Sequence, residues 1–149
     1  MQRKRPLPPT YVFLALVLMA LVHRFLPVHR YLTLPVSCIG AIPLILGILL
    51  NLAADRQFKL HQTTVKPFRA SSALITAFPF SLSRNPMYVG LTLMLLGVAL
   101  FLGTVSTLLP VAIFPYAMDR VFIRTEEQML AATFGSEWET YAAEVRRWI

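Results

Sequence analysis

The sequence predicts an all-α integral membrane protein with four transmembrane helices, a cytoplasm-facing interfacial segment and short amphipathic C-terminal helices. Three observations predict this fold. The chain of 149 residues is 56% hydrophobic and 14% charged, whereas about a quarter of the residues of a soluble domain are charged. Its apolar residues form long blocks. Its cations flank these blocks, so membrane lipid is the expected partner of the net charge of +7, and no nucleic acid is expected. The length fits a single domain over residues 1–149.

The first two apolar blocks are each expected to cross the membrane once. The block at 11–26 is short for the roughly 20 residues that a spanning helix needs, but residues 7–9 extend it. No small-residue cleavage site follows its basic start, so we expect a retained helix and not a signal peptide. The block at 34–54 contains no charged residue. Small side chains in it are expected to form a close helix contact: Gly40, Ala41 and Gly47.

The next part of the chain is expected to follow the headgroup region and then to enter the membrane as a hairpin. Residues 55–84 alternate cations with aromatic side chains, which is typical of an interfacial segment. Residues 87–118 contain no charged residue, and a single helix of that length would exceed a hydrocarbon core of about 30 Å. We therefore expect a turn near Gly103 and Thr104. The two spans that result are 87–102 and 105–123.

The C-terminal residues 125–149 are amphipathic, and Gly135 divides them into two short helices. Of the 14 lysines and arginines, all but Arg24 and Arg30 lie on the side that holds both termini and the middle loop. The positive-inside rule therefore places both termini and the candidate active site in the cytoplasm, at an inner or plasma membrane.

Two polar stretches on that side carry the candidate chemistry. The stretch Ser83–Gly90 reads Ser-Arg-Asn-Pro-Met-Tyr-Val-Gly and opens the third span. The stretch Arg124–Leu130 contains the only adjacent carboxylates of the chain, Glu126 and Glu127. Taken alone, each is typical of an ordinary helix start, with proline or acidic residues in the first turn.

Taken together, these stretches resemble the isoprenylcysteine carboxyl methyltransferase and phospholipid methyltransferase superfamily. The family pattern is similar to Arg-His-Pro-x-Tyr-x-Gly, then Glu-Glu-x-x-Leu, then Phe-Gly-x-x-Tyr-x-x-Tyr-x-x-x-Val-x-Arg. The matching residues are Arg84, Pro86, Tyr88, Gly90, Glu126, Glu127, Leu130, Phe134, Gly135, Tyr141, Val145 and Arg147. Asn85 replaces the histidine of the pattern, and Trp138 replaces its first tyrosine. An amide donates a hydrogen bond but carries no titrating proton at neutral pH.

The resemblance implies methyl transfer from S-adenosylmethionine to a lipophilic or membrane-embedded acceptor, either an isoprenylcysteine-type carboxylate or a phospholipid amine. The cofactor-binding residues that it implies are Arg84, Asn85, Pro86, Tyr88, Gly90, Glu126, Glu127 and Tyr141. The catalytic residues that it implies are Arg84, Glu127 and Arg147. An arginine suits the carboxylate of the cofactor, a glutamate suits its cationic groups, and Gly90 permits a close approach. A lipid amine must lose a proton before it attacks, and Glu127 is the nearest candidate base.

Two alternatives stay open. Membrane sterol-type reductases have a similar C-terminal architecture and bind a nicotinamide cofactor, which needs a larger basic pocket than Arg84, Arg124 and Arg147 offer. A non-catalytic membrane protein is the other alternative, and the loss of the histidine at position 85 favours it. The acceptor and the oligomeric state are not determined by the sequence.

Neither metal binding nor disulfide formation is expected. The three histidines, His23, His29 and His61, lie on different segments, whereas metal ligands must converge. The single cysteine, Cys38, has no partner in the chain and is expected to be a buried thiol, because its neighbours are apolar.

Overall fold

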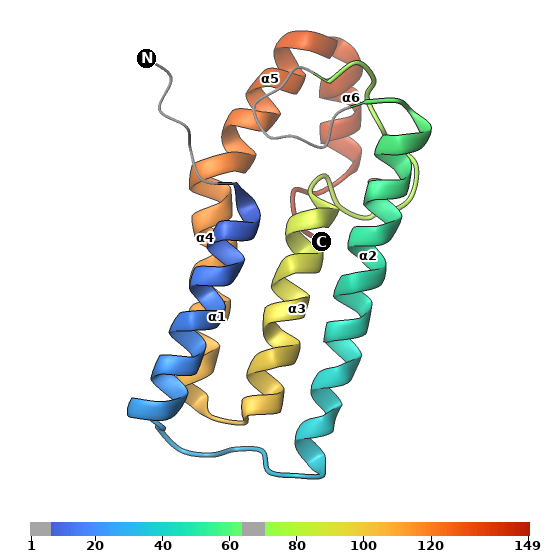
Figure 1. The fold of residues 1–149 in the computed structure, drawn as a ribbon. Helices are drawn as coiled ribbons and strands as arrows, with labels where there is room; N and C mark the ends of the chain where they lie inside the picture. The colour runs from blue at the N-terminus through green and yellow to red at the C-terminus, as the bar shows by residue number, and fades with distance from the viewer. Residues whose placement is uncertain (1–6, 64–70) are drawn as a thin grey trace.

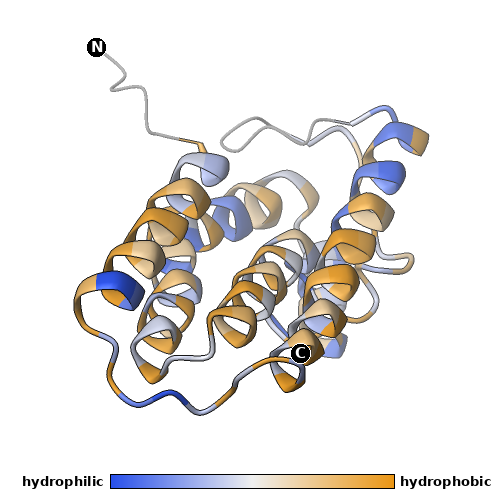
Figure 2. Ribbon diagram, turned by 60° about the horizontal axis from the view of Figure 1, so that its bottom comes forward, coloured by the Kyte–Doolittle hydropathy of each residue, from blue (hydrophilic) through white to orange (hydrophobic). Residues whose placement is uncertain are grey.

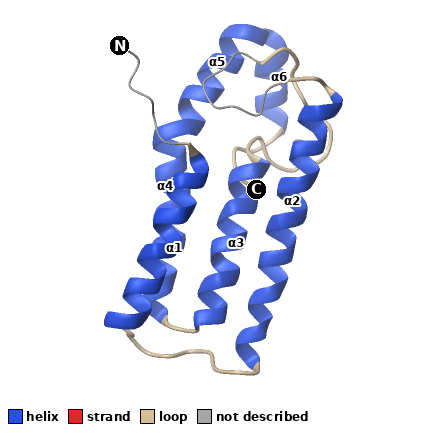
Figure 3. Ribbon diagram, in the orientation of Figure 1, coloured by secondary structure: helices blue, strands red, loops and turns tan. Residues whose placement is uncertain are grey.

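The computed structural model describes residues 7–63 and 71–149, and within them it contains helices and no strand (Figure 3). The prediction of an all-α protein is confirmed. The elements are α1 (Pro8–Phe25), η1 (Val36–Gly40), α2 (Ala41–Leu60), α3 (Pro86–Leu102), η2 (Val105–Thr107), α4 (Leu108–Met118), the π-helical η3 (Asp119–Ile123), α5 (Arg124–Phe134) and α6 (Ser136–Glu144).

The four apolar helices stand side by side, and α5 and α6 lie together at one end of the bundle (Figure 1). Helix α3 is central, because it contacts α1, α2 and α4. The main core lies where α1, α3 and α4 meet, and Met19, Leu95 and Phe122 are fully buried there. This arrangement places the start of α3 next to the C-terminal helices.

Three helices are long and apolar enough to cross a membrane by length and composition: Pro8–Phe25, Val36–Leu60 and Val105–Phe134. Helix α3 is equally apolar and has 17 residues. Large apolar side chains lie exposed on the outer faces of α1 and α2, and hydrophobic residues dominate the helix bodies (Figure 2). Such continuous apolar surfaces suit hydrocarbon and not water.

The predicted turn between the third and fourth spans is confirmed. Helix α3 ends at Gly103, which has a left-handed φ of 65°. Glycine adopts this conformation without steric cost, whereas a side chain there would also meet the carbonyl of Leu32. The Tyr31 amide donates to the Gly103 carbonyl at 2.9 Å, so the loop after α1 packs on the turn.

Two of the three small residues expected to form a helix contact, Gly40 and Gly47, form it, and its partner is α3. A Cβ atom added to Gly40 would meet the Gly97 carbonyl, and one added to Gly47 would meet the Gly90 carbonyl. Because neither helix carries a side chain at these crossings, the backbones of α2 and α3 approach each other closely.

The last predicted span, 105–123, continues without a break into the first C-terminal helix. The chain stays helical through Ile123 and Arg124, so that Val105–Phe134 forms one continuous helix. No glycine or proline occurs between Pro115 and Gly135, so no residue ends the helix earlier. The widened turn η3 begins at Asp119, one helical turn after Pro115. Gly135, with a φ of 53°, separates α5 from α6 as predicted.

Two further expectations concern the remaining segments. Cys38, which its apolar neighbours predict to be buried, is exposed in η1. An apolar run in a membrane protein faces lipid as readily as protein, which explains the difference. Residues 71–85 contain turns and no helix. Five of the cations that support the predicted orientation lie outside the described residues: Arg3, Lys4, Arg5, Lys66 and Arg69.

Candidate functional site

The C-terminal tail returns to the start of α3 and is held there by three hydrogen bonds. The Arg84 amide donates to the carbonyl of Arg146 at 2.9 Å. The Ser83 hydroxyl and the side-chain amide of Asn85 both donate to the carbonyl of Arg147, at 3.1 and 3.2 Å. The stretch Ser83–Gly90 therefore begins next to the end of the chain.

Glu127 lies between two arginines. Arg147 Nε donates to both carboxylate oxygens of Glu127 at 3.1 Å, and Arg84 Nε lies 3.7 Å from one of them. Arg147 also donates from Nη1 to Asp119 at 3.1 Å. Hydrogen bonding to Glu127 raises the pKa of the Arg147 guanidinium above its ordinary value, and the charges of Glu127 and Asp119 add to this effect. The two arginines thus compensate the charge of Glu127, and the Glu127–Arg147 pair holds the C-terminal tail in place.

Glu126, the other member of the pair, has a different environment. The Tyr88 hydroxyl donates to its two carboxylate oxygens at 3.1 and 3.2 Å. Among the described residues no cationic side chain forms an ion pair with it. Burial raises the pKa of Glu126 above its ordinary value; the Tyr88 hydrogen bond opposes this shift and the charge of Glu127 adds to it. Glu126 is therefore the carboxylate that a cation would stabilise.

A cavity of about 430 Å³ joins these groups. Its polar and amphipathic lining includes Asn51, Ser71, Arg84, Asn85, Tyr88, Glu126, Glu127, Trp138 and Tyr141. Its apolar lining includes Phe58, Ile75, Phe80, Met87, Leu91 and Leu130. Such a cavity, mostly apolar with a few convergent charged groups, is typical of a small-molecule site.

Two aromatic residues of α6 hold the wall of this cavity. The Tyr141 hydroxyl donates to the carbonyl of Phe80 at 2.7 Å, and burial raises the pKa of Tyr141 to about 12. The Arg84 guanidinium carbon lies 5.7 Å from the centre of the Trp138 ring. Arg84 Nε is buried and has no hydrogen-bond partner in the part of the chain that the structure describes. A buried unsatisfied donor is costly, so an anionic ligand atom beside it would be stabilising.

Comparison with known proteins decides the family. The family model for phospholipid methyltransferases matches residues 36–137, more than half of the chain. The chain belongs to the phospholipid methyltransferase family. This confirms the resemblance that the two polar stretches indicated.

Two similar proteins add detail to this assignment. Over 62 residues the chain is 40% identical to the phosphatidyl-N-methylethanolamine N-methyltransferase of Saccharomyces cerevisiae, an alignment that covers 42% of this chain and 30% of the yeast protein. It is also 40% identical over 63 residues to an uncharacterized protein of Haemophilus influenzae, covering 42% of this chain and 100% of that protein. No solved structure matches the chain.

In this family member, most of the predicted site residues line the cavity, and two do not. Those that line it are Arg84, Asn85, Pro86, Tyr88, Glu126, Glu127 and Tyr141. Arg147 lies behind Glu127, outside the lining. Gly90 faces α2, where an added Cβ would meet the Asn51 side chain and the Gly47 carbonyl. The close approach at Gly90 in the structure is that of a helix, and its predicted contact with a cofactor stays a prediction.

The cavity is also lined by two residues that are not among the predicted site residues, Asn51 and Trp138. Asn51 has the one side-chain amide in the uncharged second block, and its Nδ2 donates to the Gly47 carbonyl at 2.9 Å. A polar side chain inside a spanning block is itself a signal of function. Trp138 marks a departure from the family pattern, and here it forms a cavity wall next to Arg84.

Proposed function

We propose that this protein is a four-span, S-adenosylmethionine-dependent methyltransferase that methylates the amine of a phospholipid on the cytoplasmic side of the membrane. One observation carries the proposal. A single cavity contains Glu126, which lacks a cationic partner among the described residues, and Arg84, whose Nε lacks a hydrogen-bond partner. The same cavity is walled by apolar side chains of α2 and α3.

The cavity fits S-adenosylmethionine in size and in charge. Its volume of about 430 Å³ lies within the range of roughly 300–1,000 Å³ for ligand pockets. The unsatisfied Arg84 Nε suits the carboxylate of the cofactor, Glu126 suits its ammonium, and the ring of Trp138 suits its adenine. When bound, the cofactor supplies a methyl group activated by its sulfonium. The protein aligns the acceptor and excludes water.

The contacts of the two glutamates indicate a different role for each. The sequence named Glu127 as the nearest base, but Glu127 accepts the hydrogen bonds of Arg147 and lies beside Arg84. Glu126, with its raised pKa and its single donor Tyr88, is better suited to take a proton from an ammonium. We assign proton acceptance to the Glu126 carboxylate oxygen that does not face the ammonium of the cofactor, and positioning of the tail to the Glu127–Arg147 pair.

The charge of the cavity also favours a lipid amine as the acceptor. A carboxylate acceptor would be repelled by Glu126 and would need no base, whereas an ammonium is attracted to Glu126 and needs a base to remove its proton. Family membership and the similarity to a phosphatidyl-N-methylethanolamine N-methyltransferase support the same choice. A phosphorylated nicotinamide cofactor would meet two carboxylates and the single arginine Arg84, which does not suit its phosphates.

Isothermal titration of the detergent-solubilised protein with S-adenosylhomocysteine tests the cofactor site. We expect saturable binding that Glu126→Gln weakens and Glu137→Gln leaves unchanged, because Glu137 is exposed on α6 and lies outside the cavity lining. Labelled methyl transfer is then compared among phosphatidylethanolamine, its monomethylated form and an isoprenylcysteine. Absence of binding to the folded native protein would refute the proposal, and methylation of the isoprenylcysteine alone would refute the assigned acceptor.

A further inference from the structure

A second cavity lies next to the first and has the opposite charge. It measures about 560 Å³, is more open, and shares Arg84 with the first cavity. Its lining consists of Arg84, Arg120, Arg124, Arg147, Asp119, Pro115, Tyr116 and Trp148. The proposed reaction cavity holds two carboxylates and one arginine, whereas this one holds four arginines and one carboxylate.

The ion pairs of this cavity leave positive charge uncompensated. Arg124 and Arg147 both pair with Asp119, and Arg84 and Arg147 both pair with Glu127. In the described part of the chain Arg120 forms no ion pair, and its guanidinium carbon lies 5.1 Å from the centre of the Tyr116 ring. Even with both carboxylates counted, the four guanidinium groups carry two excess positive charges. Guanidinium groups at such a site favour phosphate oxygens, which they bind in a bidentate manner.

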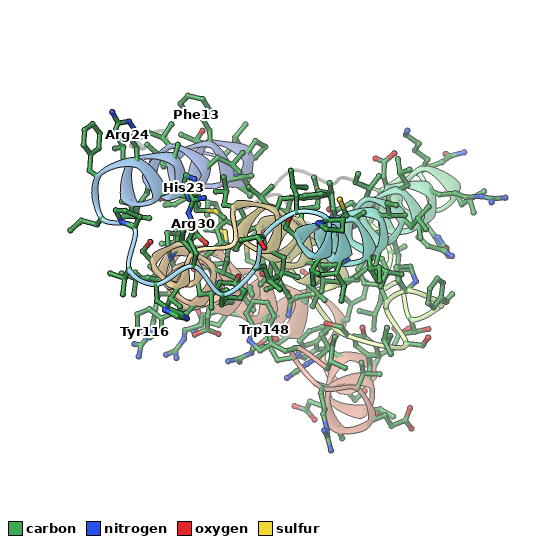
Figure 4. The ribbon with its side chains drawn as sticks, turned by 90° about the horizontal axis from the view of Figure 1, so that it is seen from below. Phe13, His23, Arg24, Arg30, Tyr116 and Trp148 are labelled. Atoms are coloured by element: carbon green, nitrogen blue, oxygen red, sulfur yellow. The ribbon has the colours of Figure 1, made fainter. Side chains whose placement is uncertain are left out.

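An apolar stripe on α4 leads to these arginines. Leu109, Ile113 and Tyr116 are 58%, 48% and 62% exposed and follow one another at steps of four and three residues. They therefore share one face of the helix, and the contact between Tyr116 and Arg120 extends that face to the charged cavity. Figure 4 shows Tyr116 and Trp148 on one side of the bundle, opposite Phe13 and Arg24. A long hydrocarbon stripe that ends at arginines fits a lipid better than a soluble anion.

We propose that this second cavity binds the phosphate of an anionic phospholipid, with an acyl chain along the stripe formed by Leu109, Ile113 and Tyr116. The proposal goes beyond methyl transfer, because the site needs no cofactor and does not use Glu126. A net negative headgroup balances the excess charge of the cavity, whereas a zwitterionic headgroup adds a cation to it. Lipid binding here would hold α5 and the C-terminal tail against the membrane surface.

Native mass spectrometry of the lipid-depleted protein in a neutral detergent tests the site, with dioleoyl phosphatidylglycerol as the probe and no methyl donor present. We expect a saturable lipid adduct whose apparent affinity falls at least about tenfold in Arg120→Gln, because a charge-assisted hydrogen bond is lost. The matched control is Arg24→Gln. Arg24 is also exposed and lies over an aromatic ring, 5.6 Å from the centre of Phe25, at the other end of the bundle. We expect this control to keep the native affinity.

The remaining outcomes each overturn the proposal. Equal weakening by both substitutions would mean a nonspecific effect of surface charge. Binding of dioleoyl phosphatidylcholine as tight as that of phosphatidylglycerol would mean that net charge is not recognised. Displacement of the lipid by an equal concentration of glycerol 3-phosphate would assign the cavity to a soluble phosphate. An unchanged unfolding temperature of Arg120→Gln establishes that the variant is folded. Because the experiment uses no methyl donor, refutation of the lipid site would leave the methyltransferase proposal standing.

Discussion

Removal of the Arg147 side chain tests whether the Glu127 network anchors the C-terminal tail. In Arg147→Gln, the carboxylate of Glu127, which is 12% exposed, keeps only the contact with Arg84 at 3.7 Å. Loss of one partner of a fully buried ion pair costs about 3–5 kcal/mol, whereas exposed pairs are worth less than about 1 kcal/mol. The side chain of Arg147 is 36% exposed and therefore lies between these cases. We expect the free energy of unfolding to fall by about 2 kcal/mol.

The assay is equilibrium unfolding in mixed micelles, followed by circular dichroism, for a double-mutant cycle. The second substitution, Glu127→Gln, removes the orphaned charge, so the double variant should be more stable than Arg147→Gln alone. The control is Arg124→Gln, since Arg124 is 49% exposed and donates to Asp119 only, and its loss should cost less than about 1 kcal/mol. If Arg147→Gln costs no more than this control, the reasoning about a buried anchor is wrong.

Three more predictions follow from the contacts. Gly90→Ala should lower the free energy of unfolding by about 1–3 kcal/mol, because the added methyl group overpacks against Asn51. The affinity of the folded fraction for S-adenosylhomocysteine should not change. Asn85→Leu should lose the bond to the Arg147 carbonyl and raise the protease sensitivity of the C-terminus, whereas Asn85→His should preserve it. Because burial raises the pKa of Glu126, protons compete with a bound ammonium, so the affinity for S-adenosylhomocysteine should rise from mildly acidic to neutral pH. Titration calorimetry should find this dependence abolished in Glu126→Gln.

The features that the sequence predicted correctly depend on local chemistry. Apolar blocks predict helices because the backbone must satisfy its own hydrogen bonds where water is absent. Gly103 and Gly135 mark helix ends because a positive φ suits glycine. The contact of Gly40 and Gly47 with α3 was predictable because small residues allow backbones to approach, although the sequence alone did not identify α3 as the partner.

The features that it did not predict depend on how helices are rotated and packed. Whether Gly90 faces a cofactor or a helix is decided by the rotation of α3, which the α2 contact sets. Adjacent helical residues point about 100° apart, so Glu126 and Glu127 necessarily face different surroundings. Only the positions of Tyr88 and Arg147 in space decide which carboxylate faces which partner. The pattern of two glutamates therefore identified the site but not the role of each.

The replacement of histidine by Asn85 does not count against catalysis. In the structure the side-chain amide of Asn85 donates a hydrogen bond to the Arg147 carbonyl. The backbone amide of Asn85 donates to the Ser83 hydroxyl at 3.1 Å. An asparagine amide fulfils the donor role as well as an imidazole does. A titrating group would be needed there only if it carried the proton of the reaction, and Glu126 is better suited to that task because burial has already raised its pKa. Asn85, one of the two departures from the family pattern, thus helps to hold the C-terminal tail, and a non-catalytic role loses its main support.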